Sequence, residues 1–359
     1  MTIHVGLIGA GNISRTHARA AKAIPGVEIA AVYGTNAEKV KQLCAEHGGS
    51  PYDDLDAFLH HRPMEMVIVG SPSGLHAEQG SAAARQGLHV LVEKPLEIST
   101  ARADALIAEC RKAAVKLGVI FQDRLKPDIR RLKQLIAAGT LGKPLLVDAR
   151  VKWYRPPEYY AGSRWRGTWA LDGGGALMNQ GSHTVDLLLW LLGDVVKVRA
   201  RTATALHAIE TEDTAMAIME FSSGALGVLQ ATTAAYPGYP RRVEITGSKG
   251  TVILEHDRII ATDLCIDDLR IDDLRIQHEN LISAETPDQN LSSSSPVVSD
   301  IRGHQLVIED FIRAVQEDGT PVCDGVQGRR SVALIQAIYE AAHIAQTDGG
   351  KKNVATDLL

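Results

Sequence analysis

Cysteine is scarce in this chain. The 359 residues include four cysteines, which stand far apart without a Cys-x-x-Cys pair or a Cys/His spacing typical of zinc sites. We therefore expect neither disulfide bonds nor a bound metal, and we assign no residue as a metal ligand. The four positions are Cys44, Cys110, Cys265 and Cys323.

Long apolar runs and an excess of basic charge are also missing. No run reaches the roughly 18 apolar residues that a membrane helix needs, and the amino-terminal segment does not read as a signal peptide. The formal net charge of -5 argues against a general nucleic-acid surface, which requires a concentrated basic face. These observations predict a cytoplasmic protein whose partners include neither nucleic acid nor a membrane.

The chain is long enough to divide into two domains. Its first third alternates short apolar runs such as "HVGLIG" with segments of helical period, which predicts an α/β Rossmann fold with a doubly wound parallel sheet. After about Gln122, longer alternating runs such as "DTAMAIMEF" predict an α+β domain with a large, open, mostly antiparallel sheet. We place the first domain at residues 1–122 and the second at 123–359, with C-terminal helices able to pack back on the first.

One short repeat stands apart from this organisation. The run "IDDLRIDDLR", residues 266–275, duplicates five residues and is too short to form a structural unit. A polar segment follows it. We assign it no chemistry.

The segment "GLIGAGNIS" follows the first expected strand and opens the first expected helix. Gly9 suits the tight turn, and Gly11 lets the backbone approach a pyrophosphate held at the helix N-terminus. Ser14 replaces the third glycine of the fingerprint and is still small enough for close packing. We therefore predict dinucleotide binding by Gly9, Gly11, Asn12 and Ile13.

The tip of the second expected strand bears on the choice between NAD and NADP. No Asp or Glu stands there to hold a ribose 2′-hydroxyl, and Thr35 and Lys39 could donate hydrogen bonds to a 2′-phosphate. The sequence leaves both cofactors open and slightly favours NADP.

Two further segments follow strands whose carboxyl ends should face the cofactor. "SPSGLH" contributes Ser71, Pro72 and His76, and "VEKPL" contributes Glu93 and Lys94. We predict that all five lie at the dinucleotide.

The run "GGGALMNQGSHTVDLLLWLLG" combines apolar residues with polar ones at helical spacing. Asn179, His183 and Asp186 stand at i, i+4 and i+7, so one face of a helix would present all three while the leucines pack. A lone histidine on such a helix is more often a packed residue than a functional one. The run acquires a functional meaning from the motifs that precede it.

In their order along the chain, "GLIGAGNIS", "SPSGLH", "EKPL" and "GGGALMNQGSHTVD" resemble the Gfo/Idh/MocA oxidoreductase family. The resemblance implies hydride transfer between NAD or NADP and one carbon of a sugar, inositol or nucleotide sugar. It also implies that Lys94 and His183 are the catalytic residues and that the Lys94–Pro95 peptide is cis. The family frequently has Asp where this chain has Asn179, whose side chain can hydrogen-bond but carries no charge to raise the pKa of His183. We expect for His183 an ordinary pKa near 6.5.

Other residues are expected to border a carbohydrate-like substrate. Aromatic rings pack on sugar faces and arginine binds carboxylate or phosphate groups, which favours Tyr154, Arg164 and Trp165 beside Asn179 and Asp186. A homodimer or homotetramer through the open sheet is the expected assembly.

Two other functions stay open. An NAD-dependent glycosidase would oxidise its sugar only transiently, and a dinucleotide-responsive binding protein would not turn over at all. The presence of both Lys94 and His183 argues against the second alternative.

Overall fold

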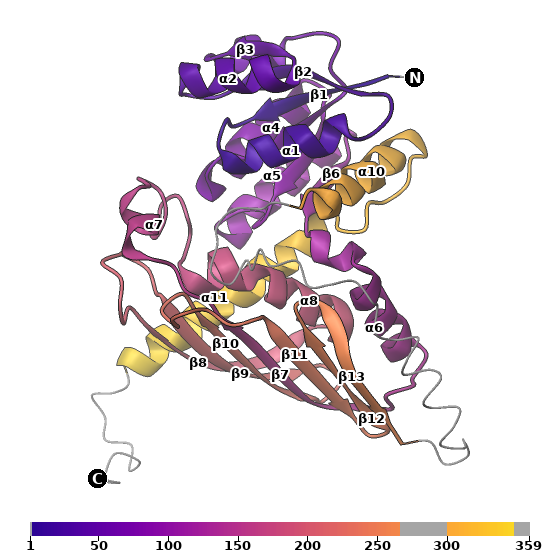
Figure 1. Cartoon of the computed structure of the whole chain (residues 1–359), viewed down its shortest axis with the longest axis vertical. Coiled ribbons are helices and arrows are strands. Elements are labelled where there is room, and N and C mark those ends of the chain that lie inside the picture. The colour runs from indigo at the N-terminus through magenta and orange to yellow at the C-terminus, as the bar shows by residue number, and fades with distance from the viewer. Residues whose placement is uncertain (1, 266–299, 348–359) are drawn as a thin grey trace.

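The computed structural model describes residues 2–265 and 300–347, and the repeat at 266–275 lies outside them. Two sheets lie one above the other along the long axis, with helices between and around them (Figure 1). The first sheet is built from residues before 121 and the second from residues after 143.

The first sheet has six parallel strands in the order β3-β2-β1-β4-β5-β6. Its central strands are buried on both faces, as expected of a parallel sheet covered by helices. The carboxyl ends of all the strands meet at one edge. The strands are β1 (Ile3–Ile8), β2 (Val27–Tyr33), β3 (Ser50–Tyr52), β4 (Met66–Val69), β5 (His89–Glu93) and β6 (Leu117–Ile120).

Helices pack on both faces of this sheet, so the predicted doubly wound fold is confirmed. Side chains of α1, α2 and α10 form the core on one face, and side chains of α3, α4 and α5 form it on the other. Asn36 and Ser99 cap the amino ends of α2 and α5. The helices of this region are α1 (Asn12–Lys22), α2 (Ala37–His47), α3 (Leu55–Leu59), η1 (Ser73–Leu75), α4 (His76–Arg85), α5 (Thr100–Lys112) and η2 (Gln122–Leu125).

The second sheet has seven strands in the order β13-β12-β11-β7-β10-β9-β8. Only the β10–β7 pair is parallel, so the predicted mostly antiparallel sheet is confirmed. The strands are β7 (Pro144–Lys152), β8 (Val195–Ala203), β9 (Thr214–Phe221), β10 (Leu226–Thr232), β11 (Arg242–Gly247), β12 (Gly250–Glu255) and β13 (Arg258–Leu264).

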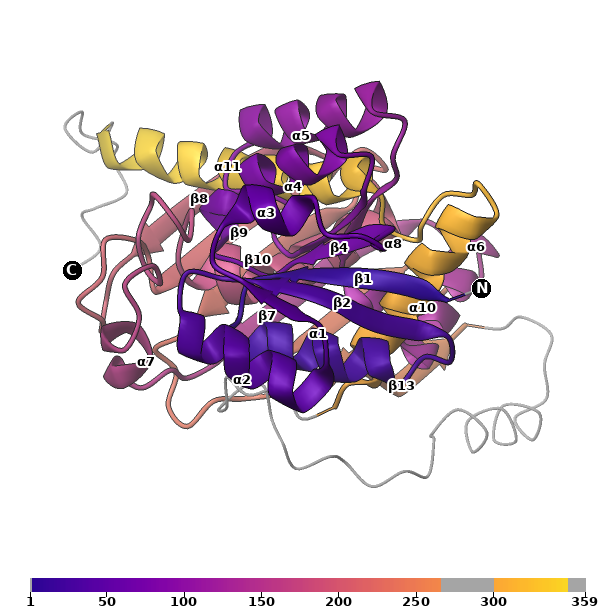
Figure 2. The same ribbon diagram turned by 90° about the horizontal axis from the view of Figure 1, so that it is seen from above.

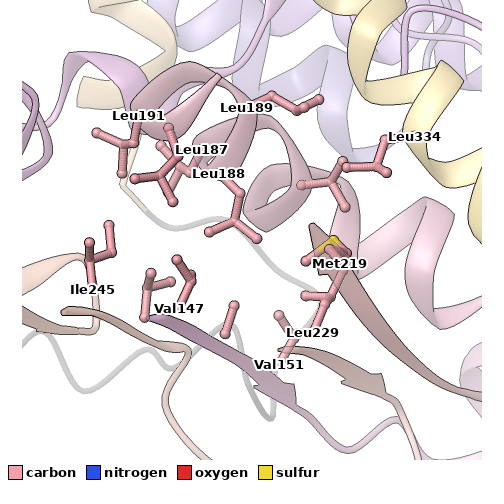
Figure 3. Packing of buried hydrophobic residues seen from close by; sticks show 14 of the residues in the cluster. Val147, Val151, Leu187, Leu188, Leu189, Leu191, Met219, Leu229, Ile245 and Leu334 are labelled. Carbon is pink, nitrogen blue, oxygen red and sulfur yellow. The ribbon is translucent and has the colours of Figure 1, made fainter. Parts of the chain in front are cut away.

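One face of this sheet carries the core. Leu187, Leu188 and Leu191 of α8 point at the sheet, where Val147 and Ile245 face them (Figure 3). Burial alternates along β9 and β10, which leaves the opposite face open, as the alternating sequence predicts. The helices beside this sheet are α6 (Pro127–Ala137), α7 (Pro157–Ala161), the π-helix η3 (Ala176–Gly181) and α8 (Ser182–Leu192).

The last two helices return to the first sheet. α10 (Arg302–Gln316) packs against α1, β5 and β6, and α11 (Gly325–Thr347) contacts α5 as well as α8 and β8 (Figure 2). Within the two described ranges, no helix is both long and apolar enough to cross a membrane.

The carboxyl edge of the parallel sheet faces η3 and α8, and the candidate site lies there.

Candidate functional site

The turn between β1 and α1 is shaped for a close approach to the backbone. Gly9 has a φ of +112°, and a Cβ there would lie 2.8 Å from the carbonyl oxygen of Gly70. Apart from its chain neighbours, no described residue has an atom within 4 Å of the position a Cβ would take on Gly11, which precedes the first turn of α1. The amide groups of Asn12 and Ile13 open this helix, so the residues present fit a dinucleotide pyrophosphate.

The segment that follows β2 carries Thr35 and Lys39, the two residues expected at the cofactor ribose. Thr35 and Lys39 are exposed, and the side-chain oxygen of Asn36 accepts the Lys39 backbone N–H at 3.0 Å as a helix cap. Thr35 and Lys39 thus reach solvent at this corner, while Asn36 is engaged in the helix itself.

His76 ties two loops of the carboxyl edge together. Its Nε2 lies 3.0 Å from the carbonyl oxygen of Ser71, and its Nδ1 lies 2.9 Å from that of Pro95. The Ser71 hydroxyl donates to Gln79. The buried His76 ring therefore serves the loops that carry Ser71 and Pro72, a contact that the motif alone does not reveal.

Lys94 follows β5 directly and reaches across to η3. Its Nζ donates a 2.6 Å hydrogen bond to the backbone carbonyl of Asn179. Burial lowers the pKa of Lys94, and the negative charges of Glu93, Asp172 and Asp123 act in the opposite direction. The Lys94–Pro95 peptide is cis, as the family resemblance implies.

The glycine run before η3 brings the chain close to two neighbouring segments. Gly173 has a φ of +75°, and a Cβ on Gly175 would clash with the Glu212 carbonyl oxygen. The Glu212 carboxylate accepts the backbone N–H groups of Gly175 at 2.9 Å and Leu177 at 2.8 Å. These bonds fix the start of η3.

Asn179 lies in the π-helix, one turn before the α-helix that holds His183. The prediction of a single helical face for Asn179, His183 and Asp186 is therefore wrong in its geometry, because the i, i+4 rule does not apply across a π-turn. The sequence has no clear signal for this turn beyond the glycines before it.

Asp172 is a site residue that the sequence reasoning missed. Its two carboxylate oxygens accept the Asn179 side-chain amide and the Gly167 backbone N–H, each at 2.9 Å. Burial raises the pKa of Asp172 to about 6, although these bonds and the charge of Lys94 oppose the shift. Its position directly before the glycine run was the available signal.

His183 lies between Phe121 and Asp123. Its ring meets Phe121 edge-on at 5.8 Å between centroids, and its Nδ1 lies 3.6 Å from Asp123 Oδ2, beyond hydrogen-bond length. Burial lowers the pKa of His183 to about 3, which corrects the expected value near 6.5. At neutral pH the ring is an uncharged acceptor.

An ion-pair network holds Asp123 in place. Arg241 Nη1 lies 2.8 Å and Lys126 Nζ 2.7 Å from its carboxylate, and both cations also pair with Asp257. Burial opposes ionisation, but the two cations hold the pKa of Asp123 well below its usual range. The residue beside His183 is therefore anionic.

Asp186 does not join this group. Its carboxylate accepts from Arg124 Nε at 2.8 Å and Nη2 at 2.7 Å, and from the Ser331 hydroxyl at 3.2 Å. Asp186 is 1% exposed. The geometry contradicts the expected substrate contact, because an ion pair to η2 and a bond to α11 engage both oxygens.

Arginines and aromatic rings border the site, though not all of those expected. The Arg166 guanidinium lies 4.3 Å from the Tyr159 ring centroid and 5.4 Å from that of Trp165. Arg155 is buried, and its positive charge lies close enough to Lys94 to act toward a lower pKa of that amine. Arg164 is exposed, and Tyr154 packs edge-on against Tyr236 at 5.2 Å. The sequence reasoning missed Arg155 and Tyr159, whereas Arg166 lies in the run "RWRGTW", residues 164–169, that was expected to border the substrate.

Comparison with known proteins identifies the family of this chain. Residues 3–121 match the oxidoreductase family with an NAD-binding Rossmann fold, and residues 129–253 match the GFO/IDH/MocA C-terminal domain. The crystal structure of the WlbA dehydrogenase from Bordetella pertussis, in complex with NADH and UDP-GlcNAcA, is 34% identical, covers 96% of both chains and has a TM-score of 0.85. The chain belongs to the Gfo/Idh/MocA oxidoreductase family.

Two curated relatives share less of their sequence with this chain than WlbA does. The myo-inositol 2-dehydrogenase of Thermotoga maritima is 29% identical, over 73% of this chain and 78% of its own length. The D-apiose dehydrogenase of Paraburkholderia graminis is 26% identical, over 95% and 88%.

Membership confirms the activity that the resemblance implied. The protein is an NAD(H)-dependent oxidoreductase that transfers hydride at a CH–OH carbon. The dinucleotide turn, Lys94 and His183 stand in the motifs that carry the resemblance, and the structure gathers them at the carboxyl edge of the parallel sheet, next to η3 and α8.

Proposed function

We propose that this protein transfers hydride between NAD(H) and a ring carbon of an anionic nucleotide sugar of the UDP-GlcNAcA class. The observation that carries the proposal is the similarity to WlbA, whose structure contains that ligand with NADH and matches this chain over 96% of its length. The positively charged border supports it, because Arg155 and Arg166 suit a carboxylate or diphosphate, whereas an uncharged polyol needs neither.

Lys94 and His183 are the proposed catalytic residues. The bound nicotinamide supplies the hydride acceptor, and the protein must remove the hydroxyl proton and stabilise the substrate oxygen. The uncharged His183 ring accepts the proton, and the charge of Asp123, 3.6 Å from Nδ1, favours the cation that results. Lys94 donates to the substrate oxygen and stabilises its developing charge.

Asp172 and Asn179 hold this arrangement together. The carbonyl oxygen of Asn179 accepts from Lys94, and its side chain donates to Asp172, so one residue links the catalytic lysine to a buried carboxylate. In family members with Asp in place of Asn179, that carboxylate lies in the helix itself. Here Asp172 supplies one from the preceding loop.

A substrate comparison tests the proposal. With NAD+, UDP-GlcNAcA should give NADH with kcat/KM at least about tenfold above UDP-GlcNAc, which lacks the carboxylate, and above myo-inositol. Arg166→Gln should narrow the difference between the two nucleotide sugars. Equal rates for UDP-GlcNAcA and myo-inositol, unchanged in Arg166→Gln, would contradict the substrate class.

The same assay separates the two alternative functions. A dehydrogenase accumulates NADH, an NAD-dependent glycosidase releases a sugar product without net NADH, and a binding protein does neither. Net NADH formation supports the proposed activity over both.

NADP preference stays a prediction. No Asp or Glu stands at residues 34–36, directly after β2, and Lys39 is exposed; both features favour acceptance of a 2′-phosphate, whereas the NADH in the WlbA complex favours NAD. Calorimetry with both dinucleotides decides: a tenfold difference in Kd, about 1.4 kcal/mol, in either direction fixes the choice.

We further propose assembly into a homodimer or homotetramer through the open face of the second sheet. Leu146, Met216, Ile218 and Leu226 lie exposed on adjoining strands of that face. Light scattering should show an oligomer that Ile218→Asp dissociates. The predicted cytoplasmic location and the absence of nucleic-acid and membrane partners stay predictions.

A further inference from the structure

Three buried titratable groups lie together behind Lys94. His17 comes from α1, Glu93 ends β5, and His304 comes from α10. His17 Nε2 lies 2.8 Å and His304 Nε2 lies 3.6 Å from Glu93 Oε1, and the two imidazole centroids are 5.7 Å apart. We call these residues the His17–Glu93–His304 cluster.

The cluster holds the backbone of the catalytic lysine. Glu93 Oε2 accepts the Lys94 backbone N–H at 2.9 Å, while Oε1 accepts from His17. On the other side of Lys94, His76 Nδ1 lies 2.9 Å from the Pro95 carbonyl oxygen. The Glu93–Lys94 peptide and the Pro95–Leu96 peptide, one on each side of the cis Lys94–Pro95 bond, are thus both held before the Lys94 side chain reaches Asn179.

The electrostatics of the cluster favour one protonation state, in which Glu93 is ionised and His17 is uncharged. Burial opposes ionisation of Glu93, but the neighbouring imidazoles of His17 and His304 hold its pKa well below the usual range. Burial lowers the pKa of His17, so that ring is uncharged at neutral pH and is free to donate one hydrogen bond. An anionic Glu93 beside Lys94 then supports the ammonium form of the lysine.

We propose that His17 and His304 are positioning residues that fix Glu93 and, through it, the backbone of Lys94. The inference rests on the proposed role of Lys94. This role also gives α10 a function, although the helix lies about 200 residues beyond Lys94 in the chain. By packing on α1, α10 brings His304 to the carboxyl edge of the parallel sheet.

The close packing around His17 indicates that its ring has one defined position. A Cβ on Gly70 would lie 3.2 Å from His17 Cε1 and 3.3 Å from its Nδ1, so the glycine at the end of β4 leaves room for the ring. The ligand atoms of the same three side chains all lie within 4.8 Å of one another, a spacing that also suits a cation site. The 2.8 Å bond from His17 to Glu93 would have to open for an ion to enter.

The first experiment separates positioning from general stability. His17→Ala and His304→Ala should each lower kcat with NAD+ and UDP-GlcNAcA about tenfold, with KM and the Kd of NAD+ within about threefold, because a misplaced lysine slows chemistry more than binding. His304→Gln, which keeps a polar side chain beside Glu93, should recover most of the loss. His4→Gln is the control, because His4 also pairs with a glutamate, Glu65 at 3.2 Å, at the opposite end of β1.

The second experiment measures the pKa and the labelling rate of the Lys94 amine in the absence of substrate. Competitive labelling with acetic anhydride across pH, followed by mass spectrometry, gives the pKa of the Lys94 amine. Glu93→Gln should lower it by at least about 0.5, because the charge of Glu93 raises it while Asp172, Asp123, Arg155 and His183 are unchanged. His304→Ala and His17→Ala should speed labelling of Lys94 by about threefold or more as its backbone is released, and His4→Gln should match wild type.

The outcomes are distinct. Wild-type kcat and labelling in both alanine variants would overturn the positioning role, as would a stoichiometric metal ion in the wild-type protein that His304→Ala loses. If wild type forms no NADH from UDP-GlcNAcA, the proposed function fails; if Lys94→Ala retains turnover, the proposed catalytic role of Lys94 fails. In both cases the labelling still decides the positioning role. If Lys94→Ala is inactive but both histidine variants behave as wild type, the positioning role alone fails.

Discussion

The ammonium group of Lys94 donates a 2.6 Å hydrogen bond to the backbone carbonyl of Asn179, and this contact joins the edge of the parallel sheet to the π-helix of the second region. Because the Asn179 side chain also donates to Asp172, the lysine, the π-turn and a buried carboxylate form one connected unit.

Lys94→Ala should lower turnover by at least about a hundredfold, in line with the loss of one donor to the developing oxyanion. The dinucleotide turn at Gly9 is untouched, so the Kd of NAD+ should change by no more than a few-fold. Steady-state kinetics and calorimetry on the same preparation check both values. Lys22→Ala, at the exposed end of α1, serves as a lysine control and should retain kcat.

His183→Ala should lose roughly a hundred- to ten-thousandfold in kcat, the usual contribution of general acid–base catalysis. Its Nδ1 has no hydrogen-bond partner within the described residues, so the melting temperature should change little. A histidine with a purely structural role would show the reverse: a lower melting temperature with kcat retained.

The pH–rate profile should have its acidic limb near pH 6, and Asp172 is the group responsible. Its carboxyl is ionised above its pKa of about 6 and protonated below it, so kcat/KM should fall as the pH drops through that value. His183, with a pKa near 3, cannot cause this limb. Asp172→Asn should lower activity and remove the limb, whereas the residual activity of His183→Ala should keep it.

Asp186→Asn should destabilise the fold by about 3–5 kcal/mol, because it leaves the buried Arg124 guanidinium without its counter-charge. Urea unfolding measures the difference. The matched control is Asp194→Asn, which breaks an exposed pair with Arg330 and should cost less than about 1 kcal/mol. Equal effects of the two substitutions would contradict a structural role for Asp186.

Glu212 should make stability depend on pH in the neutral range. Burial raises its pKa to about 7 in the folded protein, above an ordinary value of 4.5. A raised carboxyl pKa contributes stability that is fully present below 4.5 and is lost as the pH rises through 7. In Glu212→Gln this dependence should disappear, so the difference in unfolding free energy between wild type and variant should change between pH 4.5 and 7 and level off above that range.

Sequence patterns predicted the fold well because they are local. The period of two in β9 and β10, the apolar run of β5 and the fingerprint after β1 each depend on neighbouring residues. The same holds for Gly9 and Lys94, whose places follow from the strand that each one ends.

The contacts that organise the site could not be predicted in this way. Asp186 stands at helical spacing from His183, yet its partner Arg124 is 62 residues away in the chain. His304 meets Glu93 only because α10 returns to α1, and Asn179 leaves the expected helical face because η3 is a π-turn. A single sequence does not encode such tertiary partners in any local period.

Single-turnover mixing of the enzyme with NAD+ and UDP-GlcNAcA tests the central claim most directly, with NADH absorbance as the signal. The account predicts NADH formation approaching one equivalent per active site in the wild type, and a first-order rate at least about a hundredfold lower in Lys94→Ala. No NADH from UDP-GlcNAcA, or equal rates in the two proteins, would contradict it.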